Sequence, residues 1–321
     1  MLYLRNEPFL AGVVYHTSFA GSSLPPLEIT EQLVNNPFFG AVEGNWTLAE
    51  EELRKAFETA GVECIYCIGG LMRKEGINPH DFDPERRERS LGLMERMIDR
   101  AYAYGAKQVV LCSGPDVERG QRETAKEIMA ESFGRLCSYA VEHATGEPLW
   151  LCLENFDREL DQKRLLGPTD ETVAFVEEVA RDHFNIGITL DLSHVIQLGE
   201  DPRAAVRAAA RHLIHVHIAN CGLDPSYPSV FGDSHARFGA PGGAVTMSDL
   251  VAFLDEVSRQ GYLRAKTPTR LPVISFEIKP TAHEDPWGLV ANGQRALLEA
   301  VEGINHGRLD YNLPGSKENE R

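Results

Sequence analysis

The chain has 321 residues, of which 43% are apolar, and its 32 lysines and arginines against 48 aspartates and glutamates give a formal net charge of −16. This length is enough for one large domain or two ordinary ones. An acidic surface repels phosphate backbones, so the charge argues against general binding of nucleic acid. The apolar runs are shorter than the roughly 20 residues that cross a membrane, and the first residues lack the pattern of a signal peptide.

The cysteines do not form a recognisable zinc or disulfide pattern. They lie at positions 64, 67, 112, 137, 152 and 221. Cys64 and Cys67 form a C-x-x-C inside an apolar, strand-like run, where residues three apart face opposite sides. No second C-x-x-C completes a zinc site. We therefore expect buried, reduced thiols and a cytoplasmic protein.

Apolar runs and helical patterns alternate eight times along the chain. The expected strands are 9–15, 38–44, 62–70, 107–114, 147–156, 185–193, 213–221 and 271–280. The helical patterns that follow them are 26–34, 48–61, 84–105, 124–146, 169–183, 201–212, 247–261 and 287–303. Short apolar runs that alternate with longer helices indicate parallel strands joined by crossover helices.

Eight strand–helix units predict a closed (β/α)8 TIM barrel, and the chain length fits that fold. The alternative is an open, doubly wound sheet, which would usually carry a G-x-G-x-x-G after its first strand. The sequence has no such motif there, and no linker or change of composition divides it. We expect one domain over residues 1–304, followed by a polar tail over 305–321.

Polar residues stand near the ends of the last four expected strands, where the active site of such a barrel lies. They are Glu154 on strand five, Asp191 on strand six, His215 and His217 on strand seven, and Glu277 and Lys279 on strand eight. Alternate residues of a strand share a face, so the carboxylates and His217 can converge at the barrel mouth. Burying them without a partner would be costly, and a divalent cation resolves this cost. Such ligands favour a fairly hard ion, Mn²⁺ first, with Mg²⁺, Co²⁺, Zn²⁺ or Fe²⁺ as alternatives.

These residues resemble the xylose-isomerase-like sugar isomerase/epimerase superfamily, which also contains the apurinic endonuclease branch. The similarity is most specific over 150–280, in DLSH (191–194), HVHI (215–218), HARFGAPGG (235–243) and SFEIK (275–279). The resemblance implies a TIM barrel with one metal ion, held by Glu154, Asp191, His217 and Glu277. It also implies that Glu154 and Glu277 move protons on opposite faces of the substrate, and that His194 and Arg237 contact substrate oxygens.

The chemistry expected of such a site is proton transfer next to a carbonyl. A metal on the carbonyl and a neighbouring hydroxyl stabilises the developing enediolate. One carboxylate removes the proton, and a second acid returns it to the other face or to the next carbon. The protein is thus expected to be an isomerase or epimerase of a small carbohydrate or keto acid. Alternatives are a dehydratase or other lyase of the inosose or dehydroshikimate type, a phosphodiesterase acting on DNA, and a metal-free binding barrel.

Further candidates lie in the long loop 221–245 and after other strands. In the apurinic endonuclease branch a D-x-H in this loop binds an additional zinc, and Asp233 and His235 match that spacing. That branch also uses histidines near earlier strand ends, where this chain has Cys112 and glycines. Asp233 and His235 therefore contact substrate or shape the loop, hold a second metal, or lie on the surface. The other candidates are Lys279, as a substrate contact or a partner of Glu277, and His16, Glu43 and Trp46, as substrate walls. Related barrels often pair through surface helices, so a homo-oligomer is also an open expectation.

Overall fold

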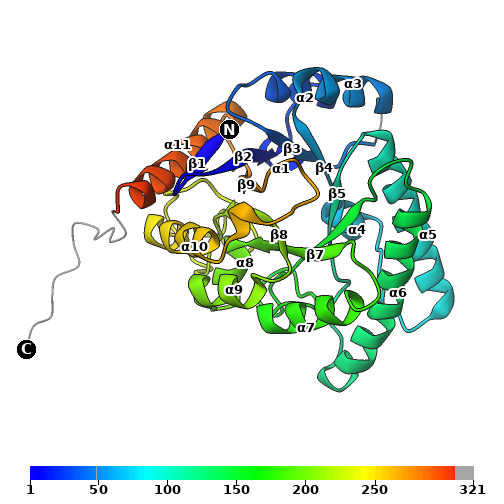
Figure 1. Ribbon diagram of the computed structural model, residues 1–321. Helices are drawn as coiled ribbons and strands as arrows, with labels where there is room; N and C mark the ends of the chain where they lie inside the picture. The colour runs from blue at the N-terminus through cyan, green and yellow to red at the C-terminus, as the bar shows by residue number, and fades with distance from the viewer. Residues whose placement is uncertain (48, 308–321) are drawn as a thin grey trace, which may run out of the picture.

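A computed structural model describes residues 1–47 and 49–307, and Figure 1 shows a ring of strands surrounded by helices. Within that range eight strands, β2 to β9, pair in parallel and in chain order, and the pairing of β9 with β2 closes the ring. The strands span Glu7–Val14 (β2), Ala41–Gly44 (β3), Glu63–Cys67 (β4), Gln108–Cys112 (β5), Trp150–Glu154 (β6), Ile186–Asp191 (β7), Leu213–Ala219 (β8) and Val273–Glu277 (β9). The expected (β/α)8 barrel is confirmed.

The main helices follow the strands in turn, and each overlaps a helix that the sequence predicts. They span Pro26–Val34 (α2), Glu50–Ala60 (α3), Pro84–Ala103 (α5), Arg122–Glu142 (α6), Thr169–Val179 (α7), Pro202–Ala209 (α9), Met247–Arg259 (α10) and Pro286–Asn305 (α11). Three of them begin with the same chemistry: Asp83, Asp201 and Asp285 precede a proline and accept hydrogen bonds from backbone N–H groups of the first turn. Such caps satisfy amides that have no partner within the helix.

Several short elements are not predicted from the sequence. They are the strand β1 (Leu2–Leu4), which pairs antiparallel with β2, the helices α1 (Tyr15–Ser18), α4 (Gly69–Lys74) and α8 (Leu192–Gln197), and the 3-10 turns Arg119–Gln121 and Tyr262–Arg264. A helix of four to six residues is too short to show an apolar period. The helices α1, α4 and α8 follow β2, β4 and β7 at the mouth of the barrel.

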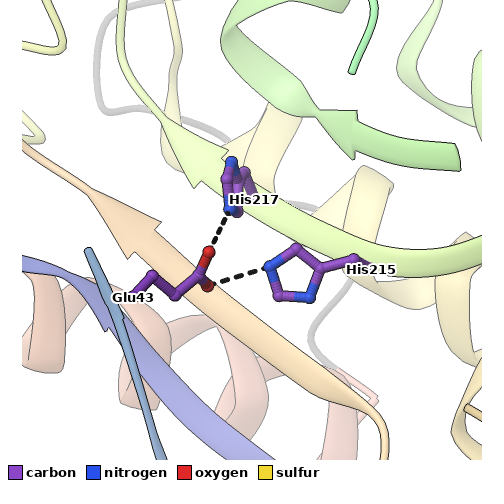
Figure 2. Close-up of side chains that lie close together, drawn as sticks. All are labelled: Glu43, His215 and His217. Atoms are coloured by element: carbon purple, nitrogen blue, oxygen red, sulfur yellow. Dashed lines mark hydrogen bonds and ion pairs between the residues drawn. The ribbon is translucent and has the colours of Figure 1, made fainter. Parts of the chain in front are cut away.

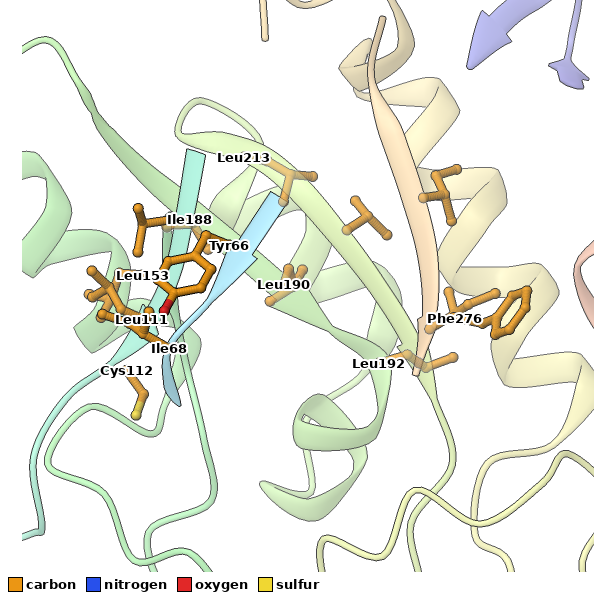
Figure 3. Packing of buried hydrophobic residues seen from close by; sticks show 14 of the residues in the cluster. Tyr66, Ile68, Leu111, Cys112, Leu153, Ile188, Leu190, Leu192, Leu213 and Phe276 are labelled. Carbon is orange, nitrogen blue, oxygen red and sulfur yellow. The ribbon is translucent and has the colours of Figure 1, made fainter. Parts of the chain in front are cut away.

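The apolar core has two parts, one inside the barrel and one between the strands and the helices, and they show which residues face the barrel axis. A small cluster that includes Leu10, Ile65 and Val110 contains no residue of the main helices and fills the barrel, whereas a larger cluster joins strands to helices. Figure 3 shows part of the larger cluster, including Leu153 and Leu190. Because successive side chains of a strand face opposite sides, the residues that follow these leucines, Glu154 and Asp191, turn inward.

The remaining expectations concern cysteines, membrane segments and the chain end. The six cysteines lie in the described part of the chain and are buried free thiols, which confirms the expectation of buried, unpaired cysteines. Among the described helices, none has both the length and the apolar character needed to cross a bilayer. The last helix, α11, ends at Asn305, close to the predicted domain end at 304, and residues 308–321 of the expected tail lie outside the described range.

One buried carboxylate shapes the loop after β6. Asp157 is 1% exposed and accepts hydrogen bonds from the backbone N–H groups of Leu160, Asp161 and Gln162, each at 2.8 Å. This loop brings Asp161 and Gln162 to the cavity at the barrel mouth.

Replacing Asp157 with alanine should therefore destabilise the protein by about 2 kcal/mol or more, because three amides lose a charged acceptor. The midpoint of urea unfolding measures this loss. Glu159→Gln changes an exposed residue of the same loop and should leave the midpoint nearly unchanged. An Asp157→Ala midpoint equal to that of the wild type would show that the loop does not depend on this carboxylate.

Candidate metal centre and active site

Three carboxylates and one imidazole meet at the carboxyl ends of β6 to β9. Glu154, Asp191, His217 and Glu277 each offer one ligand atom, and these atoms lie within 4.8 Å of one another. Nδ1 of His217 is 3.0 Å from Oε1 of Glu154, 3.5 Å from Oε2 of Glu277 and 3.9 Å from Oδ2 of Asp191. The structure thus brings together the four residues that the sequence singles out as ligands.

The hydrogen bonding of Asp191 tests whether these four residues fit a cation. Its Oδ1 accepts a hydrogen bond from the backbone N–H of Ser193, whereas its Oδ2 is buried without a hydrogen-bond partner. A buried carboxylate oxygen that lacks a donor is costly. Because this oxygen faces the other three ligand atoms, a cation among them would satisfy it. The donor set, three carboxylates and one imidazole, suits a divalent ion such as Mn²⁺.

Burial and charge shift the protonation of the group. Burial raises the pKa of Glu154. Burial alone would lower the pKa of His217, but the carboxylates of Glu43 and Glu154 outweigh it and raise this pKa well above 6.5. Positive charge is therefore strongly favoured at this position, and in the absence of metal a proton on His217 supplies it. A metal ion that binds there must displace that proton.

A further buried carboxylate, Glu43 on β3, lies behind His217. Figure 2 shows its carboxylate between two imidazoles: Oε1 is 2.8 Å from Nε2 of His215, and Oε2 is 3.0 Å from Nε2 of His217. Burial alone would raise the pKa of Glu43, but its two histidine partners hold it well below the usual value of 4.5. The sequence places Glu43 in the substrate wall. This is wrong, because the side chain is fully buried within the barrel and does not line the cavity.

A cavity of about 340 Å³ opens above the four candidate ligands. Glu154, His217 and Glu277 contribute to its lining. Its other polar walls are His16 and Thr17 from α1, Arg73 from α4, Asp161 and Gln162 after β6, Asp233 and His235 in the long loop, and Lys279 after β9. Three predicted substrate contacts, His16, His235 and Lys279, therefore lie at the cavity.

One of these wall residues, Thr17, contacts the candidate metal centre directly. The hydroxyl of Thr17 donates a hydrogen bond to Oε1 of Glu277 at 2.7 Å, which leaves Oε2 facing His217. His16 is half-buried, and its buried Nδ1 has no hydrogen-bond partner. Burial lowers the pKa of His16 to about 4, so at neutral pH this residue is an uncharged imidazole that can donate or accept a hydrogen bond.

A second cluster adjoins the first one. Ligand atoms of His194, Asp233 and His235 lie within 4.8 Å of one another. His194 is fully buried, its Nε2 lacks a partner, and its Nδ1 is 2.8 Å from Oε1 of Gln197. Burial opposes its charge, but Asp233 and other nearby carboxylates raise the pKa of His194 to about 9. The sequence links Asp233 and His235, and the structure adds His194, which does not line the cavity.

Two predicted substrate contacts, in addition to His194, do not line the cavity. Trp46 is 3% exposed, stacks on Tyr15 and donates from Nε1 to Thr30, so it belongs to the aromatic core and not to the cavity. Arg237 donates from Nε to Oε1 of Glu284 at 3.1 Å, beside a separate surface hollow. The ion pair with Glu284 holds the guanidinium of Arg237 there.

Arg73 is the cavity-lining arginine that sequence reasoning missed. It lies on α4, and its Nη1 is 3.6 Å from Oδ2 of Asp233. Its only sequence signal is its place soon after the third expected strand. The mouth of the barrel is thus lined on this side by a short helix that has no periodic pattern of its own.

The sequence and the fold of this chain are similar to those of known proteins. The sequence profile of a family described as xylose isomerase-like TIM barrel matches residues 33–285. A probable endonuclease 4 of Oleidesulfovibrio alaskensis is 34% identical over 139 residues, which are 43% of this chain and 45% of that protein. The chain therefore matches less than half the length of this relative.

Solved structures share the fold at low sequence identity. An L-ribulose 3-epimerase superposes with a TM-score of 0.70 at 17% identity, and covers 96% of this chain and 100% of its own. A D-psicose 3-epimerase determined in the presence of D-fructose gives 0.68 at 16% identity, with 92% and 100% covered. With a profile match over most of its length and the closed barrel that this profile describes, the chain belongs to the xylose isomerase-like TIM barrel family.

Proposed function

We propose that this protein is a metal-dependent sugar isomerase or epimerase that moves a proton on a carbon next to a carbonyl. One observation carries the proposal: Oδ2 of Asp191 is buried without a hydrogen-bond partner, 3.9 Å from Nδ1 of His217, in the group that Asp191 and His217 form with Glu154 and Glu277 beneath a cavity of small-molecule size. The names of the structural neighbours, L-ribulose 3-epimerase and D-psicose 3-epimerase, support the same class of reaction.

Glu154, Asp191, His217 and Glu277 would hold one divalent ion, with Mn²⁺ favoured and Mg²⁺, Co²⁺ or Zn²⁺ as alternatives. When bound, the ion would polarise the substrate carbonyl and stabilise the negative charge that develops on its oxygen. The chain itself supplies the orientation. Glu277 is held by Thr17, and Glu154 and Glu277 both reach the cavity.

Glu154 and Glu277 would transfer the protons. One carboxylate takes the proton from the carbon, and the other returns a proton to the opposite face. Burial raises the pKa of Glu154, which brings it closer to the operating pH of a useful base. Return to the opposite face is epimerisation, and return to the neighbouring carbon is isomerisation. The same two side chains serve both reactions.

The cavity walls suit a small, polar substrate. About 340 Å³ is at the lower end of the range for ligand pockets, and hydrogen-bonding groups line it on several sides. His16, His235 and Lys279 are the residues that we assign to substrate hydroxyl and carbonyl oxygens. Arg73 adds a planar group that binds carboxylates well.

This placement of Arg73 and Lys279 also favours a second candidate, a lyase that acts on a carboxylated sugar derivative. The same enolate chemistry, followed by loss of a β-hydroxyl, would be dehydration. A phosphodiesterase is favoured by the partial identity with the probable endonuclease 4 and by the cluster of His194, Asp233 and His235. The net charge of −16 opposes it, and an abasic-site cleavage assay tests it.

The metal site is tested by elemental analysis after incubation with Mn²⁺. Wild-type protein should retain about one ion per chain, and Asp191→Ala should lose it, because a ligand is removed from a four-ligand site. Asp161→Asn, which changes another carboxylate of the cavity, should retain the ion. Wild-type protein that stays empty with Mn²⁺, Co²⁺, Mg²⁺ and Zn²⁺ would contradict the proposal.

The reaction is tested in D₂O with a panel of ketoses and aldoses, by NMR of C–H to C–D exchange and of product formation. Glu154→Gln and Glu277→Gln should each lower kcat by about 10²–10⁴, the usual contribution of a general acid or base. Metal content is measured on the same samples, so that loss of the ion is distinguished from loss of the proton carrier. Full activity in both variants would exclude these residues as the acid and base.

Metal affinity should depend on pH in a defined direction. The pKa of His217 lies well above 6.5 in the metal-free protein, so a proton must leave before the ion binds. The apparent Mn²⁺ affinity should therefore rise as the pH increases above 6.5. Calorimetry in two buffers of different ionisation enthalpy should detect protons released on binding. Affinity that is constant with pH, without proton release, would contradict this exchange.

A further inference from the structure

Glu43 is a buried carboxylate whose two oxygens both contact imidazoles. It lies on β3, and its partners His215 and His217 lie on β8, across the barrel (Figure 2). Oε1 is 2.8 Å from Nε2 of His215, and Oε2 is 3.0 Å from Nε2 of His217. All three side chains are at most 1% exposed. Glu43 and His215 reach neither the surface nor the cavity, and the proposed reaction does not use them directly.

The contact determines which nitrogen of His217 is available to the cavity side. A carboxylate only accepts hydrogen bonds, so each imidazole must donate from Nε2. A neutral imidazole that carries its proton on Nε2 has its lone pair on Nδ1. Nδ1 of His217 is the atom that faces Glu154, Asp191 and Glu277. A metal ligand needs that lone pair, and in the other tautomer a proton would occupy it.

We propose that Glu43 is a positioning residue: by accepting from Nε2 of His217 it fixes the tautomer and the ring orientation that present Nδ1 to the metal. The inference rests on the proposed function, because it assumes that an ion binds among the four candidate ligands. Carboxylate–histidine–metal arrangements of this kind are general, and loss of the carboxylate costs roughly 10–100-fold in metal affinity.

Each oxygen of Glu43 accepts a hydrogen bond from one histidine. A variant of the same size can remove one of these two acceptors. Glu43→Gln replaces one acceptor oxygen by an NH₂ donor, so the side chain can accept from only one of His215 and His217. The other histidine must then turn its ring or take the opposite tautomer. We expect Mn²⁺ to bind roughly 10–100-fold more weakly to Glu43→Gln than to wild type. Calorimetry with Mn²⁺ alone measures this without any substrate.

A double variant separates positioning from a merely structural role. In Glu43→Gln/His215→Leu, only His217 remains to donate a hydrogen bond to the single acceptor oxygen of residue 43. We expect part of the lost affinity to return. If Glu43 only stabilised the core, removing a second buried polar residue would not restore metal binding.

Glu63→Gln is the matched control. Glu63 is also a glutamate of a barrel strand and is 9% exposed, but it begins β4 and pairs with Arg270 instead of a histidine. The Mn²⁺ affinity of the Glu63→Gln variant should equal that of wild type. The unfolding midpoint of each variant shows whether it is folded at the temperature of the titration.

A readout on wild-type protein does not depend on any variant being folded. In Zn²⁺-loaded protein labelled with ¹⁵N-histidine, the NMR signals of His217 should show a proton on Nε2 and the metal on Nδ1. Metal on Nε2 would overturn the proposal.

The outcomes distinguish this inference from the proposed function. If wild type binds one ion and Glu43→Gln binds it equally tightly, the positioning role fails and the metal site stands. Two ions per chain, with the second lost in Glu43→Gln, would make Glu43 a ligand and overturn the positioning role. Wild type without any ion would refute the metal site and the inference together.

Discussion

Repulsion among carboxylates buried at one end of the barrel is the constraint on which this site depends. Glu154, Asp191 and Glu277 converge within a few ångströms, and Asp191 is fully buried. Such a group is stable only when positive charge lies among its oxygens. His217 supplies that charge as a proton, and its nitrogen faces all three carboxylates. The same arrangement makes the site ready to exchange the proton for a cation.

The barrel holds these groups in place through its strand pairing. Asp191 and His217 are register partners on β7 and β8, and Glu154 is paired with the neighbouring Thr189. Each candidate ligand therefore comes from a rigid, hydrogen-bonded strand, which positions side chains more precisely than a loop does. Glu43, on a strand three places from β8 through the pairing of β9 with β2, contacts His217 only because the sheet closes on itself.

The candidate ligands and the walls of the cavity come from different parts of the molecule. The strands supply the candidate ligands and proton carriers, whereas short helices and loops supply the walls with Thr17, Arg73 and Lys279. This division is typical of barrels in which one scaffold serves several reactions. The fold that this chain shares with two epimerases at 16–17% identity therefore does not identify a substrate.

The sequence by itself determines the eight strand–helix units, because apolar periodicity is a local property. It also indicates Glu154, Asp191, His217 and Glu277, since strand ends and the alternation of faces follow from local order. Only the tertiary structure decides which distant groups meet. Glu43 lies 174 positions from His217, Arg237 pairs with Glu284, and Trp46 packs beside Tyr15. No local pattern encodes these contacts, because they arise from the closure of the barrel and the packing of its loops.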